Sequence, residues 1–230
     1  PSLAVGTAGG VHLVWSDERY RNPDVFYRST TVDDEMINDD VCSSPNQDQP
    51  ALAVDATGRA YALWEDQRHG DAGIYFSYRP AGGNWQIPTR LQDAGVQGDR
   101  FSPAIAVDAA GNAAAVWSDT RNGEADIYFA QRPAGGSWSA SEALPAAAQD
   151  YWDRSPDVAV DAAGNAYVVW DRWDYEHTDD TVLFAQRSPA GAWSQPEELG
   201  YSETDMHPAI AADALGNVML LFKDYLLRSS

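Results

Sequence analysis

The chain carries one short pattern five times, at intervals of about fifty residues. Each copy has a proline, an alanine three positions later and a glycine eight positions later, as in Pro103–Gly111. The copies begin at Pro1, Pro50, Pro103, Pro156 and Pro208, so successive prolines are 49, 53, 53 and 52 residues apart. A repeat of this length, made of strand and turn signals only, is typical of a β-propeller, in which each repeat forms one blade.

The third copy predicts the strands of one blade. Two short apolar runs, 104–107 and 113–117, flank the segment 108–112, where an aspartate can cap a hairpin turn and a glycine can adopt the left-handed conformation. A polar loop then leads to a third strand at 126–132, and a Pro-Ala-Gly-Gly turn leads to a fourth at 138–144. Four antiparallel strands of this kind make one blade.

We therefore expect an all-β fold, a single β-propeller domain over residues 1–230 with five blades, the last of which lacks its fourth strand. The blades cover about 1–49, 50–102, 103–155, 156–207 and 208–230. Two alternatives stay open: the ring closes without exchanging a strand between its ends, or flanking blades have been removed. The chain starts at the first residue of a repeat, with neither an initiator Met nor a signal peptide, which indicates a processed or excised domain.

Two features recur in most copies and favour structural roles. An aromatic residue ends each second strand, and we expect these rings to pack between blades; they are Trp15, Trp64, Trp117, Trp170 and Phe222. A Trp-x-Asp-x-Arg motif follows in three copies, as in Trp64, Asp66 and Arg68. An aspartate and an arginine two positions apart in a tight loop commonly bind each other and the local backbone.

The candidate ligand site lies where the repeat is broken. In an antiparallel blade, the loops after the second and fourth strands emerge on the same side, around the channel. The fourth blade has a longer loop after its second strand, and this sector carries extra aromatic residues beside carboxylates and an arginine, a combination that suits the binding of sugars. The candidate residues are Trp152, Asp153, Arg154, Asp171, Trp173, Asp174, Tyr175 and His177.

A second break in the repeat is the acidic segment 33–40 of the first blade, which has five carboxylates in eight residues. Oxygen ligands of this kind suit calcium, although their spacing matches no ordered calcium-binding loop and an acidic run can simply be solvated. Calcium is accordingly the one cofactor that the sequence suggests, without defining a metal site.

Charge and composition exclude several classes of partner. The formal net charge is −20 and the pI is about 4.2, so nucleic acid and anionic membrane surfaces would be repelled. No apolar run is long enough for a membrane helix, which argues against membrane insertion. Cys42 is the lone cysteine, so the chain has no internal disulfide.

Three groups of residues resemble the sialidase-like, Asp-box (BNR-repeat) propellers of secreted bacterial proteins. The turns 79–85, 132–138 and 187–193 resemble degenerate Asp-box turns that lack the aspartate, and Trp15–Arg19 resembles part of a sialidase blade. The Arg154-Ser-Pro156 segment resembles the family's arginine-x-proline entry to an inner strand. The resemblance implies an extracellular or cell-surface location, and it implies that Arg154 binds a substrate carboxylate. The family's complete catalytic set cannot be assigned in this chain.

The sequence thus favours a non-catalytic extracellular binding module that recognises a glycan or a protein through the loop face of the propeller. A sialidase-like glycoside hydrolase is the enzymatic alternative. A third interpretation is a structural repeat module, or a fragment of a larger cell-surface protein.

Overall fold

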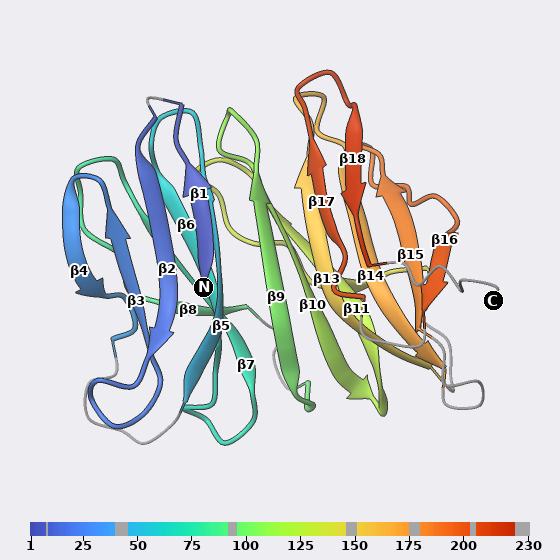
Figure 1. The fold of residues 1–230 in the computed structure, drawn as a ribbon, viewed down its shortest axis with the longest axis horizontal. Coiled ribbons are helices and arrows are strands. Elements are labelled where there is room, and N and C mark those ends of the chain that lie inside the picture. Colours follow the sequence, from blue (N-terminus) through green and yellow to red (C-terminus); the bar gives the residue numbers. More distant parts are fainter. Residues whose placement is uncertain are drawn as a thin grey trace, which may run out of the picture.

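The computed structural model of the protein describes residues 1–7, 9–39, 46–91, 96–145, 151–174, 180–202 and 206–223. These residues form five separate sheets, and every pairing within a sheet is antiparallel and follows chain order. Figure 1 shows the sheets succeeding one another from the blue first blade to the red last hairpin. The first strands of neighbouring blades lie beside one another, and residues at the start of all five copies line one central cavity, which marks the channel of the propeller. This arrangement is a β-propeller, as the repeat predicts.

Four of the five blades have four described strands. Blade 1 contains β1 (Ser2–Val5), β2 (Val11–Asp17), β3 (Asp24–Ser29) and β4 (Val32–Met36). Blade 2 contains β5 (Gln47–Val54), β6 (Ala60–Asp66), β7 (Gly73–Arg79) and β8 (Thr89–Leu91). Blade 3 contains β9 (Arg100–Val107), β10 (Ala113–Asn122), β11 (Glu124–Arg132) and β12 (Glu142–Ala143). Blade 4 contains β13 (Tyr151–Val160), β14 (Ala166–Asp174), β15 (Asp180–Arg187) and β16 (Glu197–Ser202).

Blade 5 is described as the hairpin of β17 (Ala209–Ala212) and β18 (Val218–Leu221). The sequence places a third strand of this blade after Lys223, and that segment lies outside the described residues.

Hairpin turns with one shared geometry connect the first and second strands. In blade 3 the carboxylate of Asp108 accepts hydrogen bonds of 2.9 Å from the Ala110 N–H and 2.8 Å from the Asn112 N–H. Gly111 has a φ of 88°, in the left-handed region that glycine adopts without a Cβ clash. The aspartate cap and the glycine that the sequence predicts for this turn are both confirmed.

The core lies between the blades rather than within one of them. Four apolar clusters fill the four junctions between successive blades, and each combines side chains from both sheets. Trp64, Trp117 and Trp170 are almost wholly buried, each against the blade that precedes it. The predicted packing role of these tryptophans is confirmed, because a second strand buried on both faces needs apolar side chains on both.

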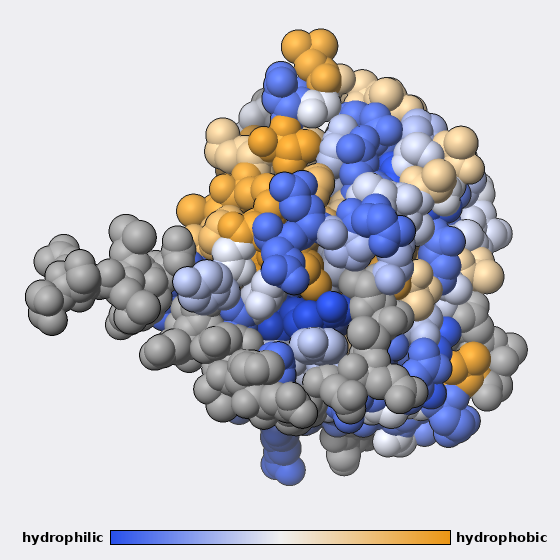
Figure 2. Space-filling view, turned by 90° about the vertical axis from the view of Figure 1, so that its right-hand side faces the viewer, coloured by the Kyte–Doolittle hydropathy of each residue, from blue (hydrophilic) through white to orange (hydrophobic). Residues whose placement is uncertain are grey.

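The two outermost blade faces are apolar but exposed. Leu3 and Val5 of blade 1 are 61% and 60% exposed, whereas Leu52, the counterpart of Leu3 in blade 2, is buried. Met219 and Leu221 of blade 5 are 74% and 73% exposed. Figure 2, which views the molecule from the right of Figure 1, shows an apolar patch at its upper left, the side on which β17 and β18 lie. In the described part of the chain, no apolar cluster joins blade 5 to blade 1.

Strand ends in blade 3 differ from the sequence expectation. β10 continues to Asn122, five residues beyond the expected end at 117, and β12 covers only Glu142–Ala143 of the expected 138–144. The segment before β12 places Trp138 edge-on against Phe76 of blade 2 and keeps a hydrogen bond from the Ser139 N–H to the Gln131 carbonyl. Because this segment packs against the neighbouring blade, only Glu142 and Ala143 pair with β11 as a regular strand. No helix in the described ranges is long and apolar enough to span a membrane.

Candidate functional site

An unusual backbone feature surrounds one end of the channel. The residue before the repeat's proline has a positive φ in four blades, between 42° and 52°. This left-handed conformation is uncommon for residues other than glycine. It accompanies an irregularity in the pairing of the first and second strands, for example between Asp48 and Ala51 and between Arg154 and Asp157. The residues concerned are Gln49, Ser102, Ser155 and His207.

These four residues line a cavity of about 420 Å³ on the channel, which we call the channel mouth. The backbone is the same in each blade, while the side chain varies. Within the cavity lining, Asp157 of blade 4 stands where blades 2 and 3 have Ala51 and Ala104. Its carboxylate accepts hydrogen bonds of 2.9 Å from the Val158 N–H and 2.8 Å from the Ile210 N–H. Burial nevertheless raises the pKa of Asp157.

Beside the channel mouth, two carboxylates of blade 4 converge on one arginine. Arg154 lies opposite Asp171 in the β13–β14 pairing, with its Nε 3.3 Å from Oδ2 of Asp171. Its Nη2 lies 2.9 Å from Oδ1 of Asp180 at the start of β15. Both carboxylates are buried, while the arginine side chain is partly exposed. One cation thus holds two anions at the edge of solvent.

Asp171 has a raised pKa and a buried carboxylate oxygen without a hydrogen-bond partner among the described residues. Burial, reinforced by the charge of Asp180, raises the pKa of Asp171 to about 6, although Arg154 opposes this shift. Its Oδ2 accepts a long hydrogen bond of 3.4 Å from the Met206 N–H. Its Oδ1 is buried and has no hydrogen-bond partner among the described residues. A carboxyl group that can be protonated near neutral pH is suited to general acid catalysis or to donating a hydrogen bond to a ligand.

Asp153, another residue that the sequence assigns to the site, forms a buried ion pair instead. Nε and Nη2 of Arg172 each donate a 2.7 Å hydrogen bond to its carboxylate. The guanidinium also lies 4.9 Å from the ring centroid of Tyr151. Both oxygens of Asp153 are engaged, so this residue holds β13 and β14 in place.

The strand register places the two tryptophans of the predicted site on neighbouring strands at the same level. Trp152 and Trp173 are directly opposite in the β13–β14 pairing, two positions from the Arg154–Asp171 pair and on the same face of the sheet. Both are partly exposed, and Trp152 stacks on Phe101 of blade 3 with ring centroids 6.2 Å apart. Asp174 lies at the end of β14, opposite Tyr151. Tyr175 and His177 lie outside the described residues.

Sequence reasoning missed four participants: Arg172, Asp180, Asp157 and Phe101. Arg172 was detectable, because it stands two positions after the repeat's tryptophan, where blades 1 to 3 have an aspartate. Asp157 was also detectable, as the one acidic residue in a position that holds Ala51 and Ala104 elsewhere. Asp180 and Phe101 carried no such signal, because their roles depend on strand register and on the packing of two blades.

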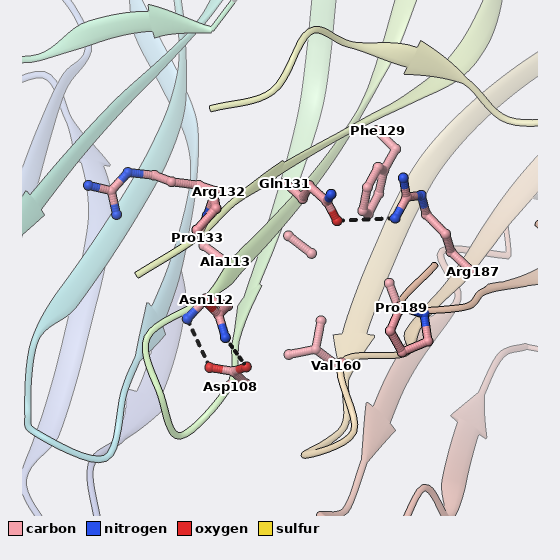
Figure 3. Close-up of a pocket in the computed structure, with 13 residues that line it drawn as sticks. Asp108, Asn112, Ala113, Phe129, Gln131, Arg132, Pro133, Val160, Arg187 and Pro189 are labelled. Atoms are coloured by element: carbon pink, nitrogen blue, oxygen red, sulfur yellow. Dashed lines mark hydrogen bonds between the residues drawn. The ribbon is translucent and has the colours of Figure 1, made fainter. Parts of the chain in front are cut away.

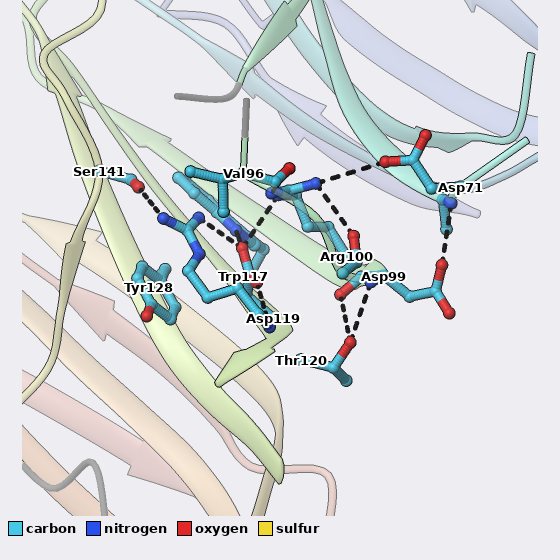
Figure 4. Close-up of polar contacts among 12 residues, drawn as sticks. Asp71, Val96, Asp99, Arg100, Trp117, Asp119, Thr120, Tyr128 and Ser141 are labelled. Atoms are coloured by element: carbon cyan, nitrogen blue, oxygen red, sulfur yellow. Dashed lines mark hydrogen bonds and ion pairs between the residues drawn. The ribbon is translucent and has the colours of Figure 1, made fainter. Parts of the chain in front are cut away.

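The Trp-x-Asp-x-Arg motifs form the expected ion pairs. Arg19 binds Asp17 and Arg68 binds Asp66, both at 2.6 Å. In blade 3, Arg121 and the fully buried Arg100 both bind Asp119, and Figure 4 shows Arg100 pointing toward that carboxylate. The arginines at this end of the propeller that stand on the first strands, Arg100 and Arg154, are therefore neutralised by carboxylates.

The acidic segment of blade 1 is also partly paired with arginines. Asp34 lies 3.1 Å from Arg28, and Glu35 lies 3.1 Å from Arg79 of blade 2. Among the described residues, no group of three or more His, Cys, Asp or Glu side chains is placed to hold a metal ion.

Comparison with solved structures agrees with the fold. A protein of unknown function from Dyadobacter fermentans matches 96% of this chain and 73% of its own, with 13% identity and a TM-score of 0.71. An ulvan lyase matches 91% of this chain with 11% identity and a TM-score of 0.64, and the match spans only 57% of the lyase chain. An α-L-arabinanase from Penicillium chrysogenum matches 96% of this chain and 73% of its own, with 10% identity and a TM-score of 0.64.

Identities this low establish the fold alone. No protein-family model and no curated protein matches the chain. The specific features of sialidases expected from the sequence are not confirmed by these likenesses, which extend only to the propeller architecture.

Proposed function

We propose that this propeller is a carbohydrate-binding domain, with its site on the blade 4 side of the channel mouth. The observation that carries the proposal is the pair of partly exposed tryptophans, Trp152 and Trp173, adjacent to the Arg154–Asp171–Asp180 cluster. Aromatic faces stack on the apolar faces of sugar rings, while the partly exposed guanidinium of Arg154 can donate hydrogen bonds to sugar hydroxyls. The solved neighbours include an arabinanase complexed with arabinobiose and an ulvan lyase bound to a glycan fragment, which supports a role of this kind.

The charges favour a neutral glycan. Arg154, which the sialidase resemblance assigns to a substrate carboxylate, already holds two aspartates. An acidic sugar would have to compete with both for the guanidinium, in a protein with a formal net charge of −20. These two facts argue against a sialidase-like substrate and also against sulfated or uronic acid-rich polymers.

A binding assay with matched variants tests the proposal. Titration calorimetry with neutral arabino-, xylo- and manno-oligosaccharides should show binding, and a sulfated uronic-acid oligosaccharide should not bind. Trp152→Ala and Trp173→Ala should each weaken binding by about tenfold, equivalent to about 1.4 kcal/mol of lost stacking. Tyr201→Ala is the control, because it removes a 69% exposed aromatic ring from the outermost strand of the same blade. Equal losses of affinity in all three variants would show that the two tryptophans do not form the sugar site. A lack of binding to every sugar would favour recognition of a protein.

Glycoside hydrolysis is the second candidate, favoured by the raised pKa of Asp171. Hydrolases of this class use one protonated and one ionised carboxyl group, and Asp171 and Asp180 offer such a pair beside Arg154. An oligosaccharide that binds should then be cleaved, and Asp171→Asn should abolish cleavage while leaving binding within a few-fold of wild type. Binding without cleavage by the wild-type protein would identify a non-catalytic module.

A further inference from the structure

A cavity lies at the opposite end of the propeller, where one copy of the repeat departs from two others. The residue three positions after the turn glycine is Tyr61 in blade 2 and Tyr167 in blade 4, but Ala114 in blade 3. Tyr61 donates a 2.9 Å hydrogen bond to Oδ2 of Asp55, and Tyr167 donates a 2.8 Å hydrogen bond to Oδ2 of Asp161. Both phenol rings are buried, so each aspartate of the turn serves as acceptor for a buried hydroxyl.

The two tyrosines fill the space beneath the turn of the following blade. A Cβ atom added to Gly111 would lie 3.0 Å from the Tyr61 hydroxyl, and one added to Gly216 would lie 3.2 Å from the Tyr167 hydroxyl. The phenols of blades 2 and 4 therefore close the junctions that these blades form with blades 3 and 5.

At the junction of blades 3 and 4, Ala114 leaves this space unfilled. A cavity of about 230 Å³ lies there, lined by Ala114 at the tyrosine position and by Asp108 and Gly164, which are the counterparts of the aspartate and the glycine beside each tyrosine hydroxyl. A Cβ atom added to Gly164 would meet only Pro189, at 3.8 Å. Figure 3 shows Asp108 and Asn112 on one side of this space, with Val160 and Pro189 on the other.

The cavity combines apolar walls with one well-placed acceptor. Phe129, Val160 and Pro189 supply apolar surface, and the guanidinium of Arg187 lies 5.0 Å from the ring centroid of Phe129. Oδ2 of Asp108 accepts a 2.7 Å hydrogen bond from Asn112 Nδ2.

That hydrogen bond leaves room for a second donor, as blade 4 demonstrates. Oδ2 of Asp161 accepts the same 2.7 Å bond from Asn165 Nδ2 and still accepts the hydroxyl of Tyr167. A carboxylate oxygen has capacity for two donors, so Asp108 can accept one more.

We propose that this cavity binds a small neutral phenol. The ring of the ligand occupies the place of the missing tyrosine ring, and its hydroxyl donates to Oδ2 of Asp108. The size is adequate, since an apolar protein cavity of roughly 150 Å³ is enough to bind benzene. The acceptor gives specificity, because an isostere without the hydroxyl cannot donate a hydrogen bond to the partly exposed carboxylate of Asp108.

The test uses p-cresol, which is the tyrosine side chain as a free molecule, and toluene, which lacks only the hydroxyl. Near saturation, p-cresol should raise the Tm of the full chain by about 2–4 °C, and toluene should bind at least tenfold more weakly. Ala114→Tyr should fill the cavity, abolish the binding of p-cresol and itself raise the Tm by a similar amount. Tyr167→Ala is the matched counterpart and should create a second p-cresol site, detected by calorimetry as a doubled stoichiometry.

Three results would overturn the proposal. The first is no calorimetric binding of p-cresol to the wild-type chain. The second is p-cresol binding that persists in Ala114→Tyr, which would place the ligand elsewhere. The third is equal affinity for toluene, which would remove the role of Asp108. If Tyr167→Ala does not fold, the wild-type and Ala114→Tyr titrations decide the question by themselves. The site lies at the end with the hairpin turns, so its occupation should leave glycan binding at the channel mouth unchanged.

Discussion

Asp153 and Arg172 occupy, with their charges exchanged, the positions that Arg100 and Asp119 hold in the preceding blade. Both pairs lie opposite each other in the ladder between the first and second strands. In blade 3 the arginine stands on the first strand and the aspartate on the second, and in blade 4 the order is reversed. Blades 3 and 4 therefore share a buried ion pair at this position in opposite orientations, whereas blade 2 has Gln47 opposite Asp66.

The reversed order of the charges predicts the outcome of a charge-swap experiment. Arg172→Ala should lower the free energy of unfolding by about 3–5 kcal/mol, because it leaves the carboxylate of Asp153 buried and unpaired. The double variant Asp153→Arg/Arg172→Asp gives the ion pair of blade 4 the orientation that it has in blade 3, with the arginine on the first strand. It should therefore recover much of the lost stability. Recovery stays incomplete because Asp126 interacts with Arg172 across the junction and would face a second carboxylate. Urea unfolding measures each step, and a double variant no more stable than Arg172→Ala would show that the pair is not interchangeable.

The raised pKa of Asp171 predicts how stability depends on pH. An aspartate in an unfolded chain has a pKa near 3.9, whereas that of Asp171 in the folded protein is about 6. Between these values the folded protein holds the extra proton, so its stability falls as the pH rises, by about 2–3 kcal/mol over the window. Asp171→Asn removes this dependence. Relative to wild type, the variant should therefore gain stability from pH 4 to pH 7.

The measurement compares unfolding free energies of the two proteins at each pH, because the many other carboxylates cancel in the difference. Asp33→Asn removes a fully exposed carboxylate of blade 1 and serves as the matched control. A difference between wild type and Asp171→Asn that stays constant across the window would mean that Asp171 is ionised throughout.

Repetition explains how much of the fold the sequence predicts. The five copies locate the blades, the buried Trp64, Trp117 and Trp170, and the ion pairs of the Trp-x-Asp-x-Arg motif, because each feature depends on residues close together in one copy. The candidate site depends on pairings across strands. The sequence predicts a ligand-binding role for Asp153, whereas the strand register places it opposite Arg172. Asp180 reaches Arg154 from a different strand, a contact that no local pattern encodes.

An ion pair that joins neighbouring blades, at the end of the propeller with the hairpin turns, suggests a stabilising substitution. The arginine that ends the third strand binds a glutamate on the outer strand of the preceding blade in two junctions. Arg79 lies 3.1 Å from Glu35, and Arg187 lies 2.7 Å from Glu142. Their counterpart Arg132 is buried over aromatic rings of blade 2, and its Nη1 has no hydrogen-bond partner among the described residues.

The ladder identifies the residue that Arg132 lacks. Thr89 pairs with Phe76 as Glu142 pairs with Phe129, so it holds the glutamate position of blade 2. Thr89→Glu should supply the missing carboxylate and stabilise the protein by about 0.5–1 kcal/mol, or roughly 1–4 °C in Tm. Thr89→Gln, which lacks the charge, is the control. Equal effects of the two substitutions would argue against an ion pair with Arg132.

Two glycine substitutions compare the junction of blades 2 and 3, which Tyr61 fills, with the junction of blades 3 and 4, which contains the cavity. This comparison needs no ligand. Gly111 and Gly164 are equivalent and have φ values of 88° and 86°, so Gly→Ala costs the same backbone strain at both. Only at Gly111 would the new methyl group meet a hydroxyl at 3.0 Å, that of Tyr61, whereas at Gly164 it faces the cavity left by Ala114. Gly111→Ala should therefore destabilise the protein by about 1–3 kcal/mol more than Gly164→Ala, because of overpacking. Combining Gly164→Ala with Ala114→Tyr should remove this difference, since it recreates at the second junction the contact present at the first. Chemical denaturation of the wild type, Gly111→Ala, Gly164→Ala, Ala114→Tyr and the double variant would measure both effects, with Ala114→Tyr as the reference for the double variant. Equal costs for the two glycine variants would mean that the junction around Tyr61 yields as readily as the cavity.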